Sequence, residues 1–523
     1  MLKDNIRSMD VSKTSAGMDV VIVACQTKEQ EDFWQKRLTD TQGAIVKPSA
    51  LIIAIHEDWP GGAGNGLGSL YAYQKAREKA YALHKIDLLQ KQREGQSIAL
   101  YHTAGEGKRL YPISASVYGN KGAILLPSLV NVQGKKEPIT LLEATLRQTS
   151  IYAPTRRGRF SVFWADQIFI PACSPHYTPR HHADILVKLM PMPTEDEWEQ
   201  KELGKYGLIT LNKQGSLQFI DKTDYPTLKY LISQGKISIS GGLGLSLGSF
   251  SLSTPLTLAL MQEFQPELIQ KNIKMDSDPY FWMPLSLEQG NYIDAMLKKG
   301  VAGEEAKNHH LRMNYFKNHF LQKHSDAALL GIVDIGTGSF WWDFGNIDSY
   351  FNNVLKVTQN TVEGYLLREF FQLEQHFAPM SVVLGSQIQK GKISSSVVIA
   401  TQADELNVEN SIVIGSAFKE MSTSHSLFYK AVEQETVHYP EKTVRADTWL
   451  SSKEKHLKIY AERTQDNKQL WTTHLPQNSE SYESIAAQLK KEHRAYQAAC
   501  GGMLQRMASG LPPERKPNFV PRS

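Results

Sequence analysis

The sequence predicts an α/β fold, with a doubly wound sheet in residues 19–376 followed by a β-helix-like domain in residues 377–480. Three observations predict this arrangement. Continuous apolar runs alternate with helical patterns through the first third of the chain, as in parallel sheets covered on both faces. Glycine-rich turns follow several of these runs. After Ala378, single apolar residues recur among small and polar ones at roughly six-residue intervals, which is typical of short stacked strands.

The elements of the first domain follow from these patterns in order. Buried strands are predicted at 19–25, 50–55, 98–101 and 160–166. Helices are predicted at 28–38, begun by Thr27, and at 70–89, after a glycine loop at 61–69. Later elements are a hairpin around 212–215, a helical insertion or lid at about 255–323, strand character at 331–343 and a long helix at about 347–376.

The second domain is predicted from its repeat. The apolar positions are Val383, Ile388, Ile393, Val398, Leu406, Ile412 and Ile414. They favour a parallel β-helix of a few coils, and a small antiparallel sheet packed on the first domain is the alternative. Residues 481–523 are expected to form a tail that is helical at first and disordered at its proline- and charge-rich end.

Composition limits the class of protein. A net charge of +4 over 523 residues gives no general reason to expect nucleic acid or an anionic membrane as a partner. The three cysteines, Cys25, Cys173 and Cys500, are far apart and form no Cys-x-x-Cys pair, which fits a reducing compartment. We see no secretory signal and no apolar stretch of membrane-spanning length, so a cytoplasmic enzyme is expected.

A glycine-rich turn follows the strand at 98–101. In this turn Gly105 and Gly107 precede Lys108 and Arg109, and Lys121 follows after a polar loop. Glycines let backbone N–H groups approach phosphate oxygens, and cations neutralise the charge, so the turn is predicted to bind a polyphosphate. It is not a P-loop, because no hydroxyl residue follows Lys108, and it lacks the third glycine of a dinucleotide fingerprint. A surface turn with solvated charges is the alternative.

Two aspartates follow predicted strands and suit Mg²⁺, which prefers hard oxygen ligands. Asp166 ends the strand at 160–166, and Asp343 lies between a strand and the helix that begins near Ile347. Asp334, in Asp-x-Gly-Thr, competes with Asp343 but leads into another strand. Asp166 as a simple cap or loop carboxylate also stays open. Lys222 follows a strand and can hold a second phosphate as a point charge, or it is a solvated hairpin lysine.

These elements together resemble the sugar-1-phosphate nucleotidyltransferases, from about Ser97 to Phe418. The shared elements are Gly-x-Gly-x-Arg-Leu with a downstream lysine, Tyr206-Gly207 before Asp221-Lys222, and Trp342-Asp343-Phe344-Gly345. The resemblance implies that Arg109 and Lys121 are the catalytic cations on the NTP triphosphate, with Gly105, Gly107 and Lys108 around the nucleotide. It implies that Lys222 binds the sugar phosphate and that Asp166 and Asp343 bind Mg²⁺. It also implies a terminal left-handed β-helix, through which homo-oligomers are possible.

Within that superfamily the region 19–76 is most similar to the L-fucose-1-phosphate guanylyltransferase branch. Its Gly64-Asn65-Gly66 loop would approach the base or ribose of GTP, and His102 falls where that branch has a histidine. Asp221-Lys222-Thr in place of Glu-Lys-Pro, and Asn346 in place of a threonine, leave the sugar open. Transfer from UTP to a hexose 1-phosphate is one alternative reaction. A catalytically silent nucleotide-sugar-binding protein is the alternative from another class.

Overall fold

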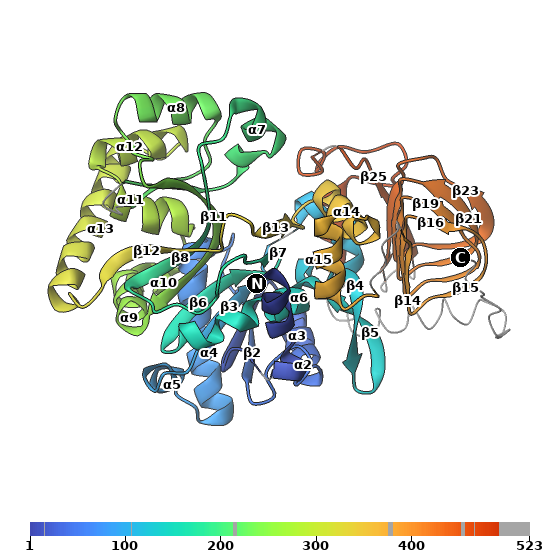
Figure 1. Cartoon of the computed structure of the whole chain (residues 1–523), viewed down its shortest axis with the longest axis horizontal. Coiled ribbons are helices and arrows are strands. Elements are labelled where there is room, and N and C mark those ends of the chain that lie inside the picture. The colour runs from blue at the N-terminus through green and yellow to red at the C-terminus, as the bar shows by residue number, and fades with distance from the viewer. Residues whose placement is uncertain are drawn as a thin grey trace.

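The computed structural model describes residues 1–490 except 15, 106, 213–216, 375–379, 451–454 and 465. The chain forms a mixed α/β protein with parallel sheets. A helix-covered sheet occupies one side of Figure 1, a stack of short strands occupies the other, and α14 (Ile347–Leu355) and α15 (Val362–Phe371) lie between them.

Four adjacent parallel strands form the centre of the main sheet. Their order is β2 (Leu51–His56), β1 (Val20–Cys25), β3 (Ile98–His102) and β6 (Arg159–Trp164). The long antiparallel β11 (Gly242–Ser253) pairs with β6 through its second half. The sheet continues from β11 to β9 (Leu208–Leu211) and β10 (Leu217–Ile220), and separately to β8 (His181–Met190) and β12 (Ala328–Asp334).

Both faces of the parallel strands are covered, as the continuous apolar runs predict. Along β1, Val21 and Val23 belong to one hydrophobic core, which also contains Trp34 of α3 (Lys28–Asp40). The alternating Ile22 belongs to the other core, which α4 (Gly64–His84) and the helices of 254–323 complete. The predicted strands of this region are confirmed, and Thr27 begins α3 as expected, its hydroxyl accepting from the Gln30 N–H at 3.3 Å.

Two helix predictions need correction. The predicted glycine loop is largely helix, because α4 begins at Gly64 and not at the expected Leu70. The predicted long helix at 347–376 is two helices, α14 and α15, the second begun by Thr361, whose side chain accepts from the Gly364 N–H. The end of that prediction, at residues 375 and 376, lies outside the described residues.

The insertion is helical over most of its length. Its elements are α9 (Thr254–Glu263), α10 (Gln265–Gln270), the π-helical turn Asp278–Trp282, α11 (Met283–Ser286), α12 (Gln289–Lys298) and α13 (Gly303–Lys323). A non-helical segment, residues 271–276, interrupts it and reaches the first turn of α4. The predicted hairpin is the antiparallel pair β9–β10, and residues 213–216 of its turn lie outside the described part of the chain.

The strands after Met380 stack in parallel with a register of fifteen residues. Val382, Val397, Ile412 and Leu427 are successive partners in one sheet. That sheet contains β14 (Val382–Leu384), β17 (Val397–Ile399), β20 (Ile412–Ile414), β22 (Leu427–Tyr429), β24 (Val444–Leu450) and the antiparallel β25 (Lys455–Ala461). The second contains β15 (Gln387–Lys390), β16 (Ile393–Ser394), β18 (Gln402–Glu405), β19 (Asn407–Glu409), β21 (Ala417–Ser424) and β23 (Val432–His438).

The expected spacing of about six residues is therefore wrong: strands recur every five residues, because three strands share each fifteen-residue turn. The alternative of a small antiparallel sheet is also wrong, since among the described strands only β25 pairs antiparallel here. Buried hydroxyls reinforce the stack: Ser411 and Ser426 donate their N–H groups to the hydroxyl oxygens of Ser396 and Ser411, one turn earlier, at 3.0 Å.

The stack is joined to the α/β part by polar contacts across the junction. The Tyr118 hydroxyl donates to the Trp449 carbonyl at 2.9 Å, and the Leu125 N–H donates to the Tyr429 hydroxyl at 3.0 Å.

The remaining elements are α1 (Leu2–Ser8), α2 (Val11–Thr14), α5 (Leu88–Arg93), β4 (Leu125–Val132), β5 (Lys135–Thr140), α6 (Leu141–Thr149), β7 (Gln167–Ile170), α7 (Glu195–Gln200), α8 (Tyr225–Ser233), β13 (Phe340–Asp343) and α16 (Tyr482–Leu489). In the described residues no helix combines the length and the apolar character needed to cross a bilayer.

Candidate functional site

A cavity of about 830 Å³ lies at the carboxyl ends of the four parallel strands. Gln26 follows β1, Glu57 follows β2, His102 ends β3 and Asp166 follows β6, and all four line the cavity. The chain passes from β1 outward to β2 and then back across β1 to β3, so the strand order reverses here. In open α/β sheets ligands bind at such a reversal, outside the carboxyl ends of the strands.

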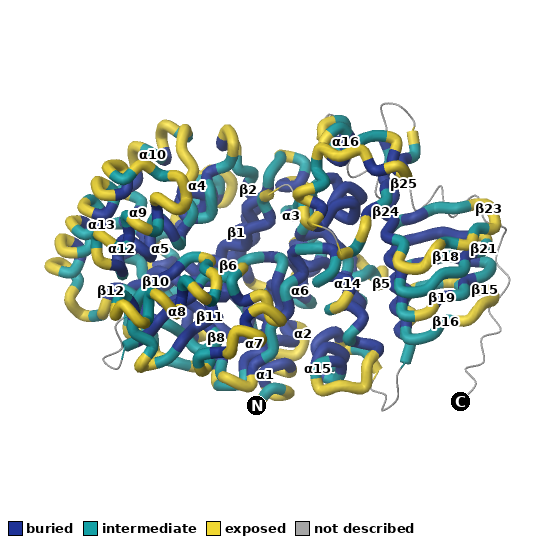
Figure 2. The backbone as a smooth tube through the Cα atoms, turned by 90° about the horizontal axis from the view of Figure 1, so that it is seen from above, coloured by how far each residue is buried: buried dark blue, intermediate teal, exposed yellow. Residues whose placement is uncertain are grey.

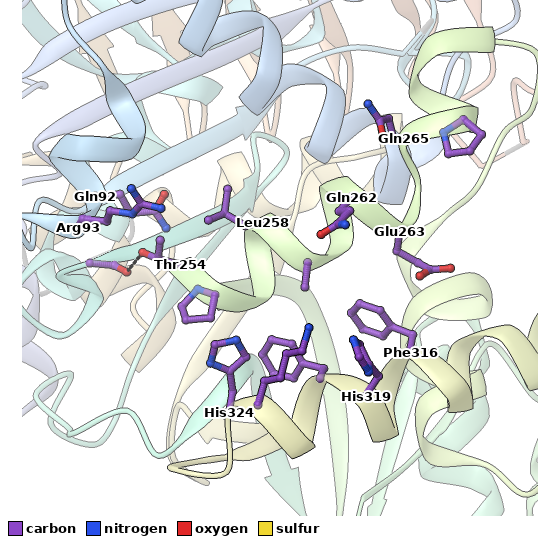
Figure 3. Close-up of a pocket in the computed structure, with 16 residues that line it drawn as sticks. Gln92, Arg93, Thr254, Leu258, Gln262, Glu263, Gln265, Phe316, His319 and His324 are labelled. Carbon is purple, nitrogen blue, oxygen red and sulfur yellow. Dashed lines mark hydrogen bonds between the residues drawn. The ribbon is translucent and has the colours of Figure 1, made fainter.

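A larger cavity, of about 1000 Å³, lies elsewhere and is the subject of Figure 3. It is lined by Leu258 of α9, by Phe316 of α13 and by Gly158, which precedes the amino end of β6. None of the site residues predicted from the sequence lines it. The smaller cavity is therefore the candidate site.

The glycine-rich turn forms one wall of this cavity. Gly105 and Gly107 have φ of +123° and +59°, backbone conformations that favour glycine. Both line the cavity together with Lys108 and Arg109, and the Ser114 hydroxyl fixes the turn by donating to the Gly107 carbonyl at 3.0 Å. Four of the predicted nucleotide-site residues thus share one wall.

The four charged groups on which the prediction depends lie together. The Lys121 ammonium is 2.8 Å from Asp166 Oδ2. Gly345, a lining residue, lies among the others: a Cβ at this glycine would be 2.9 Å from Asp343 Oδ1, 3.3 Å from Arg109 Nη2 and 3.7 Å from Asp166 Oδ2. Asp343 thus stands directly behind the cavity wall. Side chains far apart in sequence meet at one place, two cations against two carboxylates.

The two carboxylates differ in their electrostatics. Burial opposes ionisation of Asp166, but Lys121 and Arg109 outweigh it and lower the pKa of this carboxyl. Burial and the neighbouring Asp166 raise the pKa of Asp343, although Arg109 and Lys121 oppose the shift. The Tyr206 hydroxyl donates to Asp343 Oδ2 at 3.4 Å. The two carboxylates thus repel each other, and a cation shared between them would relieve this repulsion.

A short antiparallel pair, β7 with β13, brings Asp343 to Asp166. Asp343 is opposite Gln167 in this pair, and the Phe344 N–H donates to the Asp166 carbonyl at 2.8 Å. Asp334 has different partners: its Oδ1 accepts from the N–H groups of Leu189 and Gly336, both at 3.0 Å. Of the two competing aspartates, Asp343 is therefore the one beside Asp166, and Asp334 stabilises a turn.

The Gly64-Asn65-Gly66 prediction is only partly met. Gly64 and Asn65 line the cavity, whereas Gly66 does not. The Gly66 N–H donates to the Met275 carbonyl at 2.9 Å and the Asn65 N–H donates to Asp276 Oδ1 at 3.0 Å. A Cβ at Gly64 or Gly66 would come within 2.6 or 2.9 Å of the Met275 carbonyl oxygen. The structure therefore does not bring Gly66 to the cavity lining, because this glycine permits close packing of residues 271–276 on α4.

Lys222 does not line the cavity and is exposed. Its charge acts on Asp278, a partly buried acid beside Gly207, where a Cβ would lie 3.0 Å from Asp278 Oδ2. Burial, with the charge of Asp221, raises the pKa of Asp278 to about 7, while Lys222 opposes the shift. The structure therefore places Lys222 near the Tyr206-Gly207 element but does not bring it to the four converged charges.

Other cavity residues were not predicted as site residues. His102 is buried, with Nε2 2.9 Å from the Ser69 hydroxyl and its ring stacked on Trp164, and burial lowers its pKa to about 3. Glu57 was detectable in principle, since it follows a predicted strand as Asp166 does. Lys274 and Asp276 belong to the insertion, and Lys468 and Lys490 follow β25 in the chain. No local motif marks these four.

The cavity as a whole is cationic. Six cationic side chains and three carboxylates line it. The cations are Lys108, Arg109, Lys121, Lys274, Lys468 and Lys490, and the acids are Glu57, Asp166 and Asp276. Among the described residues there is no cluster of three or more His, Cys, Asp or Glu side chains suited to a metal ion. An anionic ligand is what this lining favours, with Asp166 and Asp343 as the pair that can share a cation.

No family model matches the chain, and no curated protein matches it. The feature that indicates a function most directly is the meeting of Arg109, Lys121, Asp166 and Asp343 at the carboxyl edge of the sheet.

Proposed function

We propose that this protein is a nucleotidyltransferase, which transfers a nucleotidyl group from an NTP to a sugar 1-phosphate and releases pyrophosphate. The observation that carries the proposal is the convergence of Arg109, Lys121 and Asp166, which line one cationic cavity, with Asp343 next to the lining residue Gly345. Two anions have to be held together in such a reaction, and this set supplies the cations for the phosphates and the acids for a divalent ion.

The nucleotide is expected along the wall formed by the glycine-rich turn. Gly105 and Gly107 expose backbone there, and Arg109 and Lys121 would neutralise the triphosphate. Glu57, at the end of β2, supports GTP over UTP. A carboxylate accepts from the adjacent N1–H and N2–H groups of guanine, whereas uracil presents one N–H between two carbonyls.

Mg²⁺ fits the two aspartates. Burial and the charge of Asp166 raise the pKa of Asp343. A divalent cation held by the two carboxylates would relieve their mutual repulsion. Substrate phosphates would complete the ligand set, as is usual for this ion. When bound, Mg²⁺ supplies charge compensation on the α-phosphate and the leaving pyrophosphate.

The reaction needs no protein base. An oxygen of the sugar phosphate, already deprotonated at neutral pH, attacks the α-phosphorus. The bond from the α-phosphorus to the bridging oxygen breaks, and its electron pair leaves with pyrophosphate. Arg109 and Lys121 would lie where the charge develops, and Lys121, which pairs with Asp166, would exchange this carboxylate for a phosphate oxygen during the cycle. Lys222, which is exposed and acts electrostatically on Asp278, would attract the sugar phosphate as a point charge.

The parallel strands β2, β1, β3 and β6 would be the core of a Rossmann-like nucleotidyltransferase domain, and the fifteen-residue turns a left-handed parallel β-helix. A fucose 1-phosphate-like sugar is the substrate suggested by the resemblance of residues 19–76. A hexose 1-phosphate with UTP is the alternative.

The test is turnover of the purified protein with Mg²⁺, each of the four NTPs and a panel of sugar 1-phosphates, with pyrophosphate release as the measurement. We expect one pair, with GTP as nucleotide, to be turned over. Lys121→Ala is expected to lower kcat/KM by at least about 100-fold. Absence of turnover with every pair, together with unchanged nucleotide binding by Lys121→Ala, would overturn the proposal.

A further inference from the structure

The chain beyond β25 returns to the cavity. We call residues 466–490 the C-terminal segment; it ends with α16, which Figure 2 shows beside β24 and β25. Lys468 and Lys490 of this segment line the cavity together with Arg109 and Lys121. They are far from the glycine-rich turn in sequence, and they supply two of the six cations of the lining.

Specific contacts hold the C-terminal segment on the glycine-rich turn. Asn467, which is 1% exposed, donates from Nδ2 to the Tyr111 carbonyl at 2.9 Å. The rings of Trp471 and Tyr482 pack on the Tyr111 ring, with centroids 5.2 and 4.8 Å away. The Tyr482 hydroxyl donates back to the Tyr460 carbonyl of β25 at 2.8 Å. Lys468 therefore follows a buried anchor, and its position at the cavity is fixed by the fold.

The same segment also contacts a cation of the turn. The Lys108 ammonium lies 4.6 Å from the centroid of the Trp471 ring, a cation–π contact. Lys108 is itself a lining residue. Trp471 thus lies where it can position Lys108, while Lys468 reaches the cavity directly.

We propose that the C-terminal segment is part of the polyphosphate site: Lys468 binds the β- and γ-phosphates of the nucleotide, or the pyrophosphate product, and Trp471 is a positioning residue for Lys108. This inference rests on the proposed function for the identity of the ligand. It adds a residue set outside the glycine-rich turn, and it makes the stacked-strand part of the chain a contributor to the site.

The first experiment measures binding without turnover. Isothermal titration calorimetry with inorganic triphosphate, on the full chain at low salt, compares Lys468→Ala with the wild type. Loss of one charge-assisted contact is expected to weaken binding about tenfold. Lys455→Ala is the matched control, since Lys455 is an exposed lysine of β25 outside the cavity lining, and its affinity is expected to equal that of the wild type. Equal affinities for Lys468→Ala and wild type would overturn the direct role.

The second experiment tests positioning. Trp471→Ala is expected to weaken triphosphate binding about threefold, and Trp471→Phe, which keeps an aromatic face, is expected to restore most of it. In a Lys108→Ala background the effect of Trp471→Ala should vanish, because the lysine that it positions is gone. A threefold loss that persists in that background would show a merely structural role for Trp471.

Inorganic triphosphate separates this inference from the proposed function. If no NTP and sugar phosphate pair is turned over, triphosphate binding and its dependence on Lys468 can still be measured. If turnover is found and Lys468→Ala raises neither the KM for the nucleotide nor the dissociation constant for triphosphate, the reaction stands and the inference fails.

Discussion

Lys121 and Asp166 form an ion pair, with 2.8 Å between Nζ and Oδ2, although they come from different elements of the sequence. Both side chains are largely buried, with 16% and 21% of their surfaces exposed. The cation expected to bind a phosphate therefore already has an anionic partner, and the carboxylate expected to bind a metal ion already has a cationic one. Ligand binding has to compete with this pair.

Asp166→Asn is predicted to strengthen GTP binding without Mg²⁺ and to lower turnover with Mg²⁺. Removal of the carboxylate charge frees Lys121 and removes a repulsion, so GTP binding in EDTA is expected to tighten about threefold or more. In Mg²⁺ the variant loses a metal ligand, and pyrophosphate release is expected to fall at least about 100-fold. Calorimetry in EDTA and a turnover assay measure the two effects. Weaker GTP binding in EDTA would contradict the competition described for the wild type.

Gly345→Ala tests how closely the four charges are packed. The new methyl group would lie 2.9 Å from Asp343 Oδ1 and 3.3 Å from Arg109 Nη2. The carboxylate and the guanidinium therefore have to move away from the methyl group. We expect turnover to fall about tenfold or more, with a thermal midpoint within about 2 °C of the wild type. Gly338→Ala is the control, since its nearest neighbour would be Ala172 Cβ at an ordinary 3.6 Å. Equal activity of both variants would show that the charges tolerate displacement.

Asp278→Asn is predicted to change how stability depends on pH. Burial and Asp221 raise the pKa of Asp278 to about 7, so the folded protein keeps this acid protonated where the unfolded chain has lost the proton. Its contribution to stability is complete below about pH 4 and is lost as pH rises towards 7. Between pH 5 and 8 the wild type is expected to lose about 2 kcal/mol more than Asp278→Asn.

Urea denaturation at the two pH values measures this difference. Asp294→Asn, at an exposed position on α12, is the control and is expected to follow the wild type. Parallel pH dependence of Asp278→Asn and wild type would contradict a raised pKa.

The hydroxyl ladder of the stacked strands gives a prediction about stability alone. The Ser411 hydroxyl accepts from the Ser426 N–H at 3.0 Å and donates to the Glu409 carbonyl at 2.7 Å. Ser411→Ala leaves a buried N–H without its acceptor and is expected to cost about 1–2 kcal/mol in the free energy of unfolding. Ser411→Thr keeps the hydroxyl, as Thr401 does at an equivalent place, and is expected to cost less. Equal losses in urea denaturation would show that packing, not the hydroxyl, matters there.

The parallel strands could be predicted from the sequence because burial on both faces leaves a local pattern. Val20–Cys25, and Leu51–His56 up to its terminal histidine, are apolar without alternation, and each is buried almost throughout. The same patterns place Asp166 and Glu57 at strand ends, so part of the candidate site could be predicted too. The position of Asp343 beside Asp166 cannot be predicted from strand patterns alone, because it depends on the pairing of β13 with β7.

Features set by distant contacts could not be predicted in this way. The helical start of α4 depends on Met275 and Asp276, which accept from its first N–H groups although they belong to the insertion. The exposed position of Lys222 depends on how the hairpin packs. The five-residue strand spacing is hidden in the sequence because only some of the buried positions hold large apolar residues. Ala403 and Ala417, for example, are also buried.

The cavity takes its lining from residue 26 at one extreme and residue 490 at the other. During translation the four parallel strands and the glycine-rich turn emerge from the ribosome long before Lys468 does. A nascent chain can therefore fold its sheet early while its ligand cavity still lacks one wall. That wall can close only after residues 466–490 have been synthesised, because Lys468 and Lys490 belong to it.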